Sequence, residues 1–394
     1  MKLAIIMPSI HPMPPIVGAG LERLIDIFLH ENEKSEIPLE ITVFSRSDVR
    51  SAELAKNFSR SKFVYLNTTR SEPDSNRIEC FFAQKIGVAP MRFDYLRELK
   101  KALKGREFDE ILLANCLEFA KPLAKFMKKS LIVYERGTIS VPDWADFRFV
   151  KHFIFSSEYT KNAAIDVGVP SERASVVYDA VDTEMFDSSR FPAIRAEKRA
   201  KYGLSDDDIL LVFVGRLVPD KGVIELIKAV AQSSWNSSKL KLLLVGSAQL
   251  GEDVRDEYRE MLEAASPEGK IIFIGSVKPT STARFLARAD IAVVPSVWDE
   301  PAGIPVLEPM SIGLPLIISD SGALGEYASG LGEYCNTVKR GLGYVGSLAK
   351  AIDSMAAKVS DHELRASASE ALRAAARKFD GTEFYREFHE IITK

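Results

Sequence analysis

Short apolar runs separated by longer amphipathic stretches dominate the first half of the chain. The runs are bounded by polar or turn-forming residues, which is typical of buried strands. Their alternation with helical segments predicts a doubly wound parallel sheet. The expected strands are Met1–Pro8, Glu40–Ser45, Lys62–Tyr65, Glu110–Ala114, Leu131–Tyr134, Phe153–Ser156 and Ser175–Tyr178.

A glycine-rich turn joins the first expected strand to the first expected helix, in which apolar residues recur at helical spacing from Leu21 to Leu29. Gly18 and Gly20 allow a ligand close to the backbone, where the N–H groups of the helix start face it. The same glycines would equally serve to pack the helix on the sheet. The spacing is not Gly-x-Gly-x-x-Gly, so a dinucleotide site is not expected.

The alternation of strands and helices returns in the second half and predicts a second Rossmann-like domain. Helices are expected over Val223–Ser233, Asp253–Ala265 and Ser281–Arg288, with a further short helix from about Pro305. The expected strands are Ile209–Val214, Lys241–Val245, Ile271–Ile274, Ile291–Pro295 and Leu316–Ser319.

The C-terminal segment is expected to be helical from Asp361, to break at Phe379–Thr382 and to end in a last helix. The apolar face of that helix would let it return to the first domain. A length of 394 residues fits two domains. The predicted division is 1–190 for an N-terminal acceptor-side domain, 191–375 for a C-terminal nucleotide-sugar-binding domain and 376–394 for the returning helix.

Composition limits the classes of function. With 46% hydrophobic and 27% charged residues the chain is of globular type, and a net charge of −3 gives no nucleic-acid footprint. Cys80, Cys116 and Cys335 are too widely spaced to suggest a zinc site or a disulfide framework. The start of the chain is interpreted as a strand and not as a signal peptide, and no apolar stretch reaches ~20 residues, so a cytoplasmic protein is expected.

The stretch Val293–Gly313 is the strongest candidate for chemistry. Glu300 in a loop and Glu308 in the following helix can face one crevice at the carboxyl end of the sheet, where open α/β sheets bind ligands. Ionised carboxylates accept hydrogen bonds from sugar hydroxyls, and the N–H groups after Gly303 suit an anion such as a diphosphate. For the two glutamates alone, a surface loop with an acidic helix would be the simpler interpretation.

A second candidate site follows the strand Ile209–Val214, where Arg216 and Lys221 flank a strand-to-helix connection. A phosphate there would meet a guanidinium fork, an ammonium group and a helix N-terminus. At ~4 Å and an effective dielectric near 20, each unit-charge contact is on the order of 4 kcal/mol before desolvation. The alternative is surface charge beside a turn, which does not explain the second anion-suited helix start after Gly303.

The loops after the next two strands are placed to hold a flat nucleobase. Gly246 opens the first of these loops, and Val277 in the second is a candidate apolar contact.

A basic segment in the first half carries lysines that the periodicity places on one helical face, with apolar residues nearby. This face is a candidate docking surface for anionic lipid, since each basic residue near such a surface gives about 1 kcal/mol. A solvated helix face is the alternative. The lysines are Lys121, Lys125, Lys128 and Lys129.

The chain resembles the retaining glycosyltransferases of family 4, and among them bacterial enzymes of surface-polysaccharide or lipopolysaccharide assembly. The motifs that carry the resemblance are spread over most of the chain. Two are specific to the family, Phe213–Gly222 and Glu300–Gly313. The supporting segments are Gly18–Arg23, Ser157–Thr160 and Val176–Asp182 with Phe186.

The resemblance implies the GT-B fold, with two Rossmann-like domains facing a central cleft and a C-terminal helix crossing back to the first domain. It implies a retaining transfer of a sugar from a nucleoside-diphosphate donor, with UDP favoured, to a glycan or lipid-linked acceptor, without metal or cofactor. The protein could then lie at the inner face of the plasma membrane. The leaving phosphate would take the acceptor proton.

The resemblance also implies roles for residues. Arg216, Lys221 and Glu300 would be catalytic, the first two on the donor diphosphate and Glu300 on the donor sugar. Glu308 would hold the ribose. The implied substrate-binding residues are Gly18, Gly20, Glu135, Arg136, Gly215, Gly246, Val277, Ala302, Gly303, Ile304, Val306 and Glu308.

The chain departs from the family pattern near the donor sugar. Asn115 and the pair Glu135-Arg136 stand where relatives usually have histidine, and Ala302 stands where phenylalanine is customary. Glu135 could replace the histidine contact, Arg136 could hold an anionic acceptor, or the two could form a structural ion pair. The identities of the base, sugar, acceptor and linkage are not indicated by any residue.

Two other functions stay open. One is a sugar-nucleotide epimerase or a glycosyl phosphorylase on the same fold, and the other is a non-catalytic nucleotide-sugar-binding protein.

Overall fold

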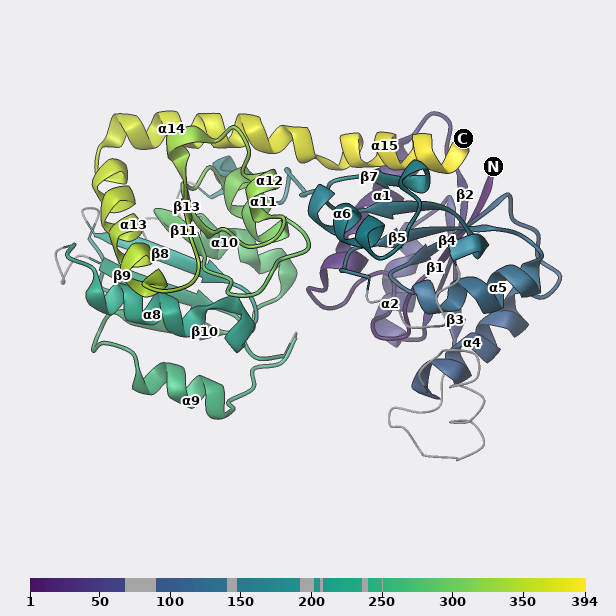
Figure 1. Cartoon of the computed structure of the whole chain (residues 1–394), viewed down its shortest axis with the longest axis horizontal. Coiled ribbons are helices and arrows are strands. Elements are labelled where there is room, and N and C mark those ends of the chain that lie inside the picture. Colours follow the sequence, from purple (N-terminus) through teal and green to yellow (C-terminus); the bar gives the residue numbers. More distant parts are fainter. Residues whose placement is uncertain (68–89, 140–146, 192–201, 206–207, 236–239, 250) are drawn as a thin grey trace. The chain divides into compact units, whose positions relative to one another are not determined.

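The chain forms two compact units (Figure 1). The computed structural model describes residues 1–67, 90–139, 147–191, 202–205, 208–235, 240–249 and 251–394. Unit 1 comprises Met1–Tyr178 and Gly381–Lys394, and unit 2 comprises Asp179–Asp380. The chain therefore passes from one unit to the other twice. The divisions predicted from the sequence fall after residues 190 and 375, whereas the units of the structure change after residues 178 and 380.

Unit 1 contains a seven-stranded sheet in the order β3-β2-β1-β4-β5-β6-β7, and every pairing is parallel. The order reverses at β1, which makes the sheet doubly wound as predicted. All seven predicted strands are present, with bounds that differ by a few residues at their ends. The strands are β1 (Lys2–Ile6), β2 (Glu40–Arg46), β3 (Ser61–Leu66), β4 (Glu110–Ala114), β5 (Leu131–Glu135), β6 (Val150–Phe155) and β7 (Ala174–Val176).

Helices connect the strands of unit 1. The first helix buries the predicted apolar stripe, including Leu24, Ile25 and Phe28. Ser157 caps α6, since its Oγ accepts a hydrogen bond from the N–H of Thr160 at 3.1 Å. The helices are α1 (Gly20–Lys34), α2 (Val49–Leu54), α4 (Pro90–Leu103), α5 (Ala120–Met127), α6 (Glu158–Asp166) and α15 (Gly381–Thr393).

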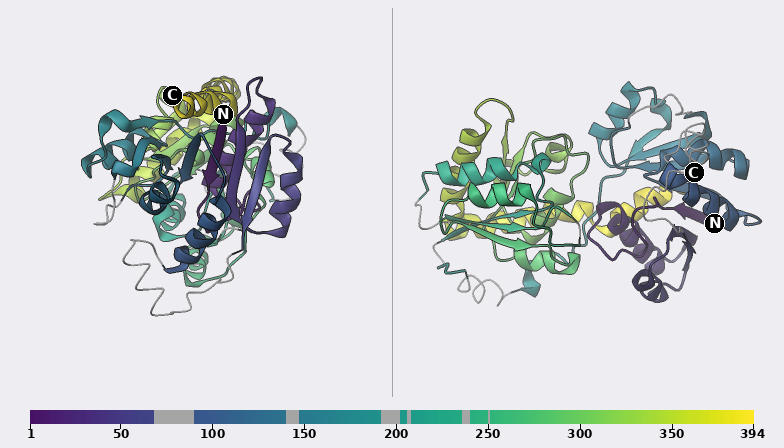
Figure 2. Two further views of the ribbon diagram at one scale, coloured as in Figure 1. Left: turned by 90° about the vertical axis from the view of Figure 1, so that its right-hand side faces the viewer. Right: turned by 90° about the horizontal axis from the view of Figure 1, so that it is seen from below.

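The last helix, α15, packs against α1 in unit 1, which confirms the predicted return to the first domain. The ring of Phe388 is almost fully buried and lies 5.5 Å from the ring of Phe28 and 4.9 Å from that of Tyr134. The hydroxyl of Tyr385 donates to Asn32 Oδ1 at 3.0 Å. Both chain termini consequently lie close together in unit 1 (Figure 2).

Unit 2 contains a six-stranded parallel sheet in the order β10-β9-β8-β11-β12-β13. The five predicted strands are present. The sixth, β13, was not predicted, because it is only partly buried and has no apolar run. The strands are β8 (Ile209–Val214), β9 (Leu240–Val245), β10 (Ile271–Gly275), β11 (Ile291–Val294), β12 (Leu316–Ser319) and β13 (Cys335–Val338).

The helices of unit 2 cover its sheet, and α8 and α13 pack together over one core that includes Leu211, Phe213, Leu226 and Ile352. The long helix α13 was not predicted, whereas the helical segment from Asp361 was. The helices are α8 (Val223–Gln232), α9 (Glu257–Ala264), α10 (Thr282–Leu286), α11 (Ile304–Ile312), α12 (Leu324–Tyr327), α13 (Tyr344–Val359) and α14 (His362–Ala376).

The prediction that four lysines share one helical face is wrong. Lys121 and Lys125 lie one turn apart on α5, but this helix ends at Met127. Lys128 is its C-cap, in the left-handed region at φ 53°. The ammonium of Lys129 donates to the carbonyl oxygen of Phe108 at 2.9 Å and to that of Asp109, so Lys129 ties the loop before β4 to the chain after α5.

Other expectations concern burial and membranes. Cys116 is fully buried, Cys335 is partly buried, and Cys80 lies outside the described residues. Within the part of the chain that the structure describes, no helix is both long and apolar enough to cross a bilayer.

Replacing Phe388 by Ala removes a ring that lies between α1, β5 and α15. We expect the free energy of unfolding of unit 1 to fall by about 3–5 kcal/mol, because a large buried ring leaves a cavity. Urea unfolding followed by circular dichroism measures this change. The control is Phe126→Ala, whose ring is 39% exposed and for which we expect a change within about 0.5 kcal/mol. Equal effects of the two variants would contradict the docking of α15.

Candidate functional site

The candidate site lies where the strand order of unit 2 reverses. β8 lies between β9 and β11 in the sheet, and the loops after β8 and β11 leave the same edge. In parallel sheets a ligand binds at such a point, outside the carboxyl ends of the strands. The two specific motifs of the sequence are these two loops, and the fold therefore brings them together.

Lys221 and Glu300 form an ion pair at this point. Lys221 Nζ lies 2.6 Å from Glu300 Oε1, and the two side chains are 16% and 5% exposed. Ser296 Oγ donates to the same oxygen at 2.5 Å. Such a buried pair is stable only with good geometry and further hydrogen bonds, both of which it has. No described residue donates to the second oxygen, Oε2, and the ammonium has further N–H donors to offer.

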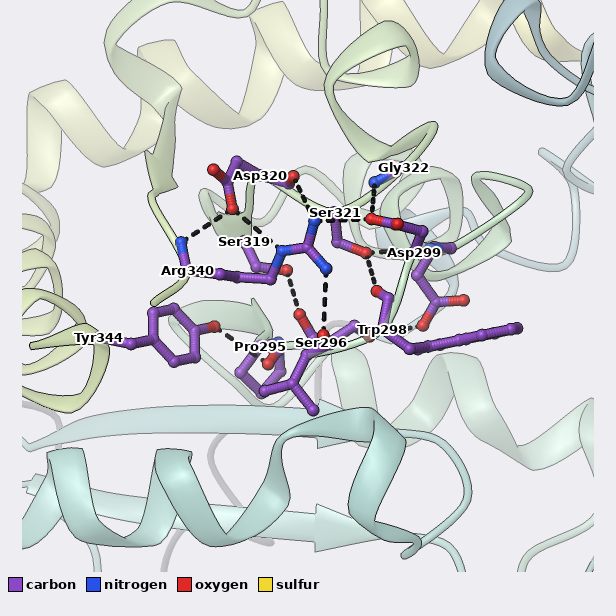
Figure 3. A network of polar contacts seen from close by, with 12 residues as sticks. Pro295, Ser296, Trp298, Asp299, Ser319, Asp320, Ser321, Gly322, Arg340 and Tyr344 are labelled. Atoms are coloured by element: carbon purple, nitrogen blue, oxygen red, sulfur yellow. Dashed lines mark hydrogen bonds and ion pairs between the residues drawn. The ribbon is translucent and has the colours of Figure 1, made fainter. Parts of the chain in front are cut away.

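The loop that carries Glu300 is held by buried serines (Figure 3). Ser319 Oγ donates to the carbonyl oxygen of Ser296 at 2.7 Å. Ser321 Oγ donates to the carbonyl oxygen of Trp298 at 2.5 Å and accepts from the N–H of Glu300 at 3.0 Å. Since Ser319 ends β12 and Ser321 follows it, the neighbouring strand positions the loop that carries Glu300.

Arg340, just after β13, holds the same loop from a second side (Figure 3). Its guanidinium lies 2.6 Å from Asp299 Oδ1 and 3.1 Å from Asp320 Oδ1, and it donates to the carbonyl oxygen of Val297 at 3.0 Å. Burial alone would lower the pKa of Arg340, but the hydrogen bonds and charges of the two aspartates raise the pKa above its ordinary value. Neither Arg340 nor Ser296 was predicted from the sequence to support the site.

The loop after β8 packs directly on the loop after β11. Gly222 has φ 67°, and a Cβ added there would lie 1.9 Å from the carbonyl oxygen of Pro295. The N–H of Val297 donates to the carbonyl oxygen of Asp220 at 3.0 Å. Only glycine permits this approach, which brings Lys221 within reach of Glu300. Arg216, earlier in the loop, is exposed, and no hydrogen bond joins its guanidinium to any residue that the structure describes.

The start of α11 offers few N–H groups. Gly303 is the N-cap, Pro305 has no N–H, and the N–H groups of Val306 and Leu307 both donate to the Gly303 carbonyl oxygen. Among the described hydrogen bonds, none uses the N–H of Gly303 or Ile304, so these two remain for a ligand. Val306 is fully buried and its N–H is used within the helix; Ala302 is also buried.

Gly303 lies against the ring of Tyr327 from α12. A Cβ at Gly303 would lie 2.1 Å from Tyr327 Cγ, so no larger residue fits here. Tyr327 is in turn fixed, because its hydroxyl accepts from the N–H of Asp179 at 2.9 Å.

Glu308, the second glutamate of the motif, lies within α11. It is 5% exposed on α11 and lines a small cavity of about 20 Å³ together with Phe213, Val294 and Pro305. The cavity lies beside the carboxyl ends of β8 and β11.

Gly246, expected in a loop beside the base, and Gly215, implied to bind substrate, both take part in close backbone packing. Gly215 donates its N–H to the carbonyl oxygen of Val245 at 3.0 Å, and a Cβ at Gly246 would lie 1.8 Å from the Gly215 carbonyl oxygen. Val277 is partly buried just after β10. The loops after β8, β9 and β10 are therefore adjacent along the sheet edge.

The remaining candidates belong to unit 1. Gly18 lies before α1 and Gly20 begins it, while Glu135 ends β5 and Arg136 follows. The N–H of Arg136 donates to Asn115 Oδ1 at 3.0 Å, and Asn115 is in the left-handed region at φ 54°. A hydrogen bond thus joins Asn115 and Arg136, two of the residues that stand where relatives usually have histidine.

No pattern in the sequence singled out Glu22 in α1 as a candidate residue. It is 3% exposed, and burial raises the pKa of its carboxyl group while the charges of His11 and Arg136 oppose this. Its place in an amphipathic helix gave no signal.

Comparison with known proteins identifies unit 2. Residues 194–375 match the family described as Glycosyl transferases group 1. The chain contains a glycosyltransferase group 1 domain. This domain nearly coincides with the predicted nucleotide-sugar-binding domain.

Curated relatives resemble the chain to different extents. Spore coat protein SA of Bacillus subtilis is 25% identical over 82% of this chain and 81% of its own length. The lipopolysaccharide 1,2-N-acetylglucosaminetransferase of Salmonella typhimurium is 28% identical over 44% of this chain and 45% of its own length. In six of eight curated relatives compared, the match covers less than half of the relative.

A solved structure extends the likeness to the whole chain. The crystal structure of HepE from Anabaena in complex with UDP-glucose has a TM-score of 0.76 at 18% identity, covering 100% of this chain and 99% of that one. At this identity the likeness concerns the fold, and it confirms the predicted GT-B class for the two sheets and the C-terminal helix. The central cleft between the domains stays a prediction.

Replacing Gly303 by Ala in the glycosyltransferase domain would place a methyl group inside the Tyr327 ring. We expect a loss of about 1–3 kcal/mol in the free energy of unfolding, because overpacking forces neighbours to move. Urea unfolding measures it. The control is Gly325→Ala, which meets nothing within 4 Å and should not destabilise. Normal stability of Gly303→Ala would contradict the close packing of this loop.

Proposed function

We propose that the protein is a retaining glycosyltransferase that moves a sugar from a UDP-sugar to a glycan or lipid-linked acceptor during assembly of a bacterial cell-surface polysaccharide. The observation that carries the proposal is the Lys221–Glu300 pair, with 2.6 Å between Nζ and Oε1, at the reversal point of the unit 2 sheet. A cation and a carboxylate side by side suit the junction of a diphosphate and a sugar.

The order of the loops along the sheet edge supports this substrate. The loops after β10 and β9 come first, then the β8 loop with Arg216 and Lys221, then the β11 loop with Glu300. A nucleoside-diphosphate sugar consists of base, ribose, diphosphate and sugar in that order, so its base, diphosphate and sugar follow the order of these loops. Glu300 Oε2 would accept a hydrogen bond from a sugar hydroxyl, and Glu308 would hold the ribose.

The proposed chemistry uses fixed charges. As the bond from the anomeric carbon to the β-phosphate oxygen breaks, negative charge grows on the leaving UDP. Arg216, Lys221 and the N–H groups of Gly303 and Ile304 would stabilise that charge more than the ground state. The acceptor oxygen bonds to the anomeric carbon on the same face, and its proton passes to the leaving phosphate oxygen. These steps call on no metal and no cofactor.

The relatives support the donor and the biological role. HepE is described in complex with UDP-glucose, which supports a UDP-sugar here. A lipopolysaccharide N-acetylglucosaminetransferase among the relatives supports a cell-surface acceptor. In unit 1, Gly18, Gly20, Glu135 and Arg136 are proposed to complete the binding of donor and acceptor.

We expect Lys221→Ala and Glu300→Gln each to slow UDP release from UDP-glucose by on the order of 10²-fold or more, because each removes a group aimed at the reacting junction. The assay is made with and without a lipid-linked glycan fraction as acceptor. The control is Lys228→Ala, which removes an exposed lysine on α8 and should keep normal turnover. Normal turnover in either test variant, with circular dichroism unchanged, would remove the assignment.

The same incubation separates the alternative functions. An epimerase would convert UDP-glucose to its epimer without any acceptor, and a phosphorylase would need free phosphate. A non-catalytic binding protein would bind UDP-glucose with neither hydrolysis nor transfer under any acceptor.

We further propose that the α4–α5 surface of unit 1 contacts anionic lipid. Lys121, Lys125 and Lys128 are on this surface, and Phe126 between them is 39% exposed. The ammonium of Lys100 on α4 lies 5.9 Å from the Phe126 ring, so both helices contribute basic groups around one apolar side chain. Lys129 is left out, because its ammonium binds backbone carbonyl groups.

We expect the double variant Lys121→Glu/Lys125→Glu to bind phosphatidylglycerol vesicles at least about 30-fold more weakly, because two basic residues contribute about 2 kcal/mol. Vesicle co-sedimentation measures this, with phosphatidylcholine vesicles for comparison. Lys56→Glu/Lys62→Glu, on other parts of unit 1, is the charge-matched control. Equally weak binding of the wild-type protein to both lipids would contradict the proposed membrane contact.

A further inference from the structure

We propose that Trp298 is the platform on which a sugar ring of the acceptor stacks, an inference that rests on the proposed transferase function. Trp298 lies two residues before Glu300, and its side chain is 39% exposed. In Figure 3 the indole points away from the polar network that holds its own backbone. Beside the proposed reacting centre, this partly exposed indole presents an apolar ring and a polar N–H, a combination that suits a ligand with an apolar face and polar edges.

The backbone of Trp298 is fixed on both sides. Its carbonyl oxygen accepts from Ser321 Oγ at 2.5 Å, and its N–H donates to the carbonyl oxygen of Asp220 at 3.4 Å. Arg340 binds the residues before and after it, at the Val297 carbonyl oxygen (3.0 Å) and at Asp299 Oδ1 (2.6 Å). The fold therefore holds this indole in one place while leaving it exposed, as a preorganised binding surface requires.

The orientation of the ring is also set. Lys221 Nζ lies 5.0 Å from the ring centroid, within the range of a cation–π contact. This contact occupies one face of the indole with the same ammonium that pairs with Glu300. The exposed part of the ring is thus adjacent to the reacting junction and not distant from it.

The position along the sheet edge assigns the platform to the acceptor. Lys221 follows β8, and Glu300 with Trp298 follows β11, on the side away from the β9 and β10 loops proposed for the base. The donor sugar is already assigned to Glu300. The ring that must approach its anomeric carbon is the acceptor sugar.

The chemistry of a pyranose fits this surface. Its axial C–H groups form an apolar face that packs on an aromatic ring, while its hydroxyls point outward. The indole Nε1–H can also donate to a hydroxyl. A flat aromatic ring is needed for this packing, and an aliphatic side chain of similar bulk does not provide it.

The test is saturation-transfer-difference NMR on protein saturated with UDP, with the methyl α- and β-glycosides of glucose, galactose and mannose as probes. We expect at least one glycoside to bind wild type through its ring C–H protons. Trp298→Ala and Trp298→Leu should weaken its dissociation constant at least tenfold. Trp298→Phe should weaken it less than threefold, as should Leu342→Ala, which removes another exposed apolar side chain. Circular dichroism checks the fold of each variant, and the UDP affinity of each variant sets the UDP concentration that keeps it saturated.

Replacing UDP by UDP-glucose distinguishes the two sugars. A glycoside that stays bound supports an acceptor platform, whereas its displacement assigns the platform to the donor sugar and overturns the inference. Retained binding in Trp298→Leu, or no glycoside binding by wild type that does bind UDP, would also overturn it. A wild type that binds neither UDP nor UDP-glucose would instead overturn the proposed function, and the platform with it.

Discussion

The ion pair between Lys221 and Glu300 is the interaction on which the rest of the site depends. Two charges with little exposure are stable only if each finds close partners, and losing one partner of such a pair costs about 3–5 kcal/mol. The pair requires β8 and β11 to be neighbours, and it requires a residue without Cβ at Gly222 so that the two loops can touch. This 2.6 Å contact therefore depends on both the strand order and the local backbone conformation.

The pair also explains why distant segments converge on one loop. Glu300 can accept from a lysine, a serine and a ligand only if its backbone does not move. Ser321 and Arg340 prevent that movement, and they belong to the chain after β12 and β13. The residues that follow the last two strands of unit 2 therefore hold the Glu300 loop in place. In the proposed transfer these fixed groups would need no rearrangement as charge develops, which is how preorganised dipoles and cations accelerate a reaction.

Much of the fold was predictable, because buried strands leave apolar runs, and most strands in the described part of the chain carry one. The exception, β13, is half polar. Lys221 and Glu300 were predictable as residues at strand ends, but their contact depends on strand order, which apolar runs do not encode. Arg340 gave no signal, since its partners are 20 to 43 residues earlier in the chain. The lysine patch was partly wrong because the helix ends at Met127, a boundary set by the left-handed Lys128.

The central claim is that Lys221 holds the diphosphate and Glu300 the sugar of one bound donor. Calorimetric titration of UDP and of UDP-glucose into wild type, Lys221→Met and Glu300→Gln tests it most directly. The account predicts that Lys221→Met weakens both ligands similarly, whereas Glu300→Gln weakens UDP-glucose at least tenfold more than UDP. Equal weakening of UDP and UDP-glucose by Glu300→Gln, or unchanged UDP affinity in Lys221→Met, would contradict it.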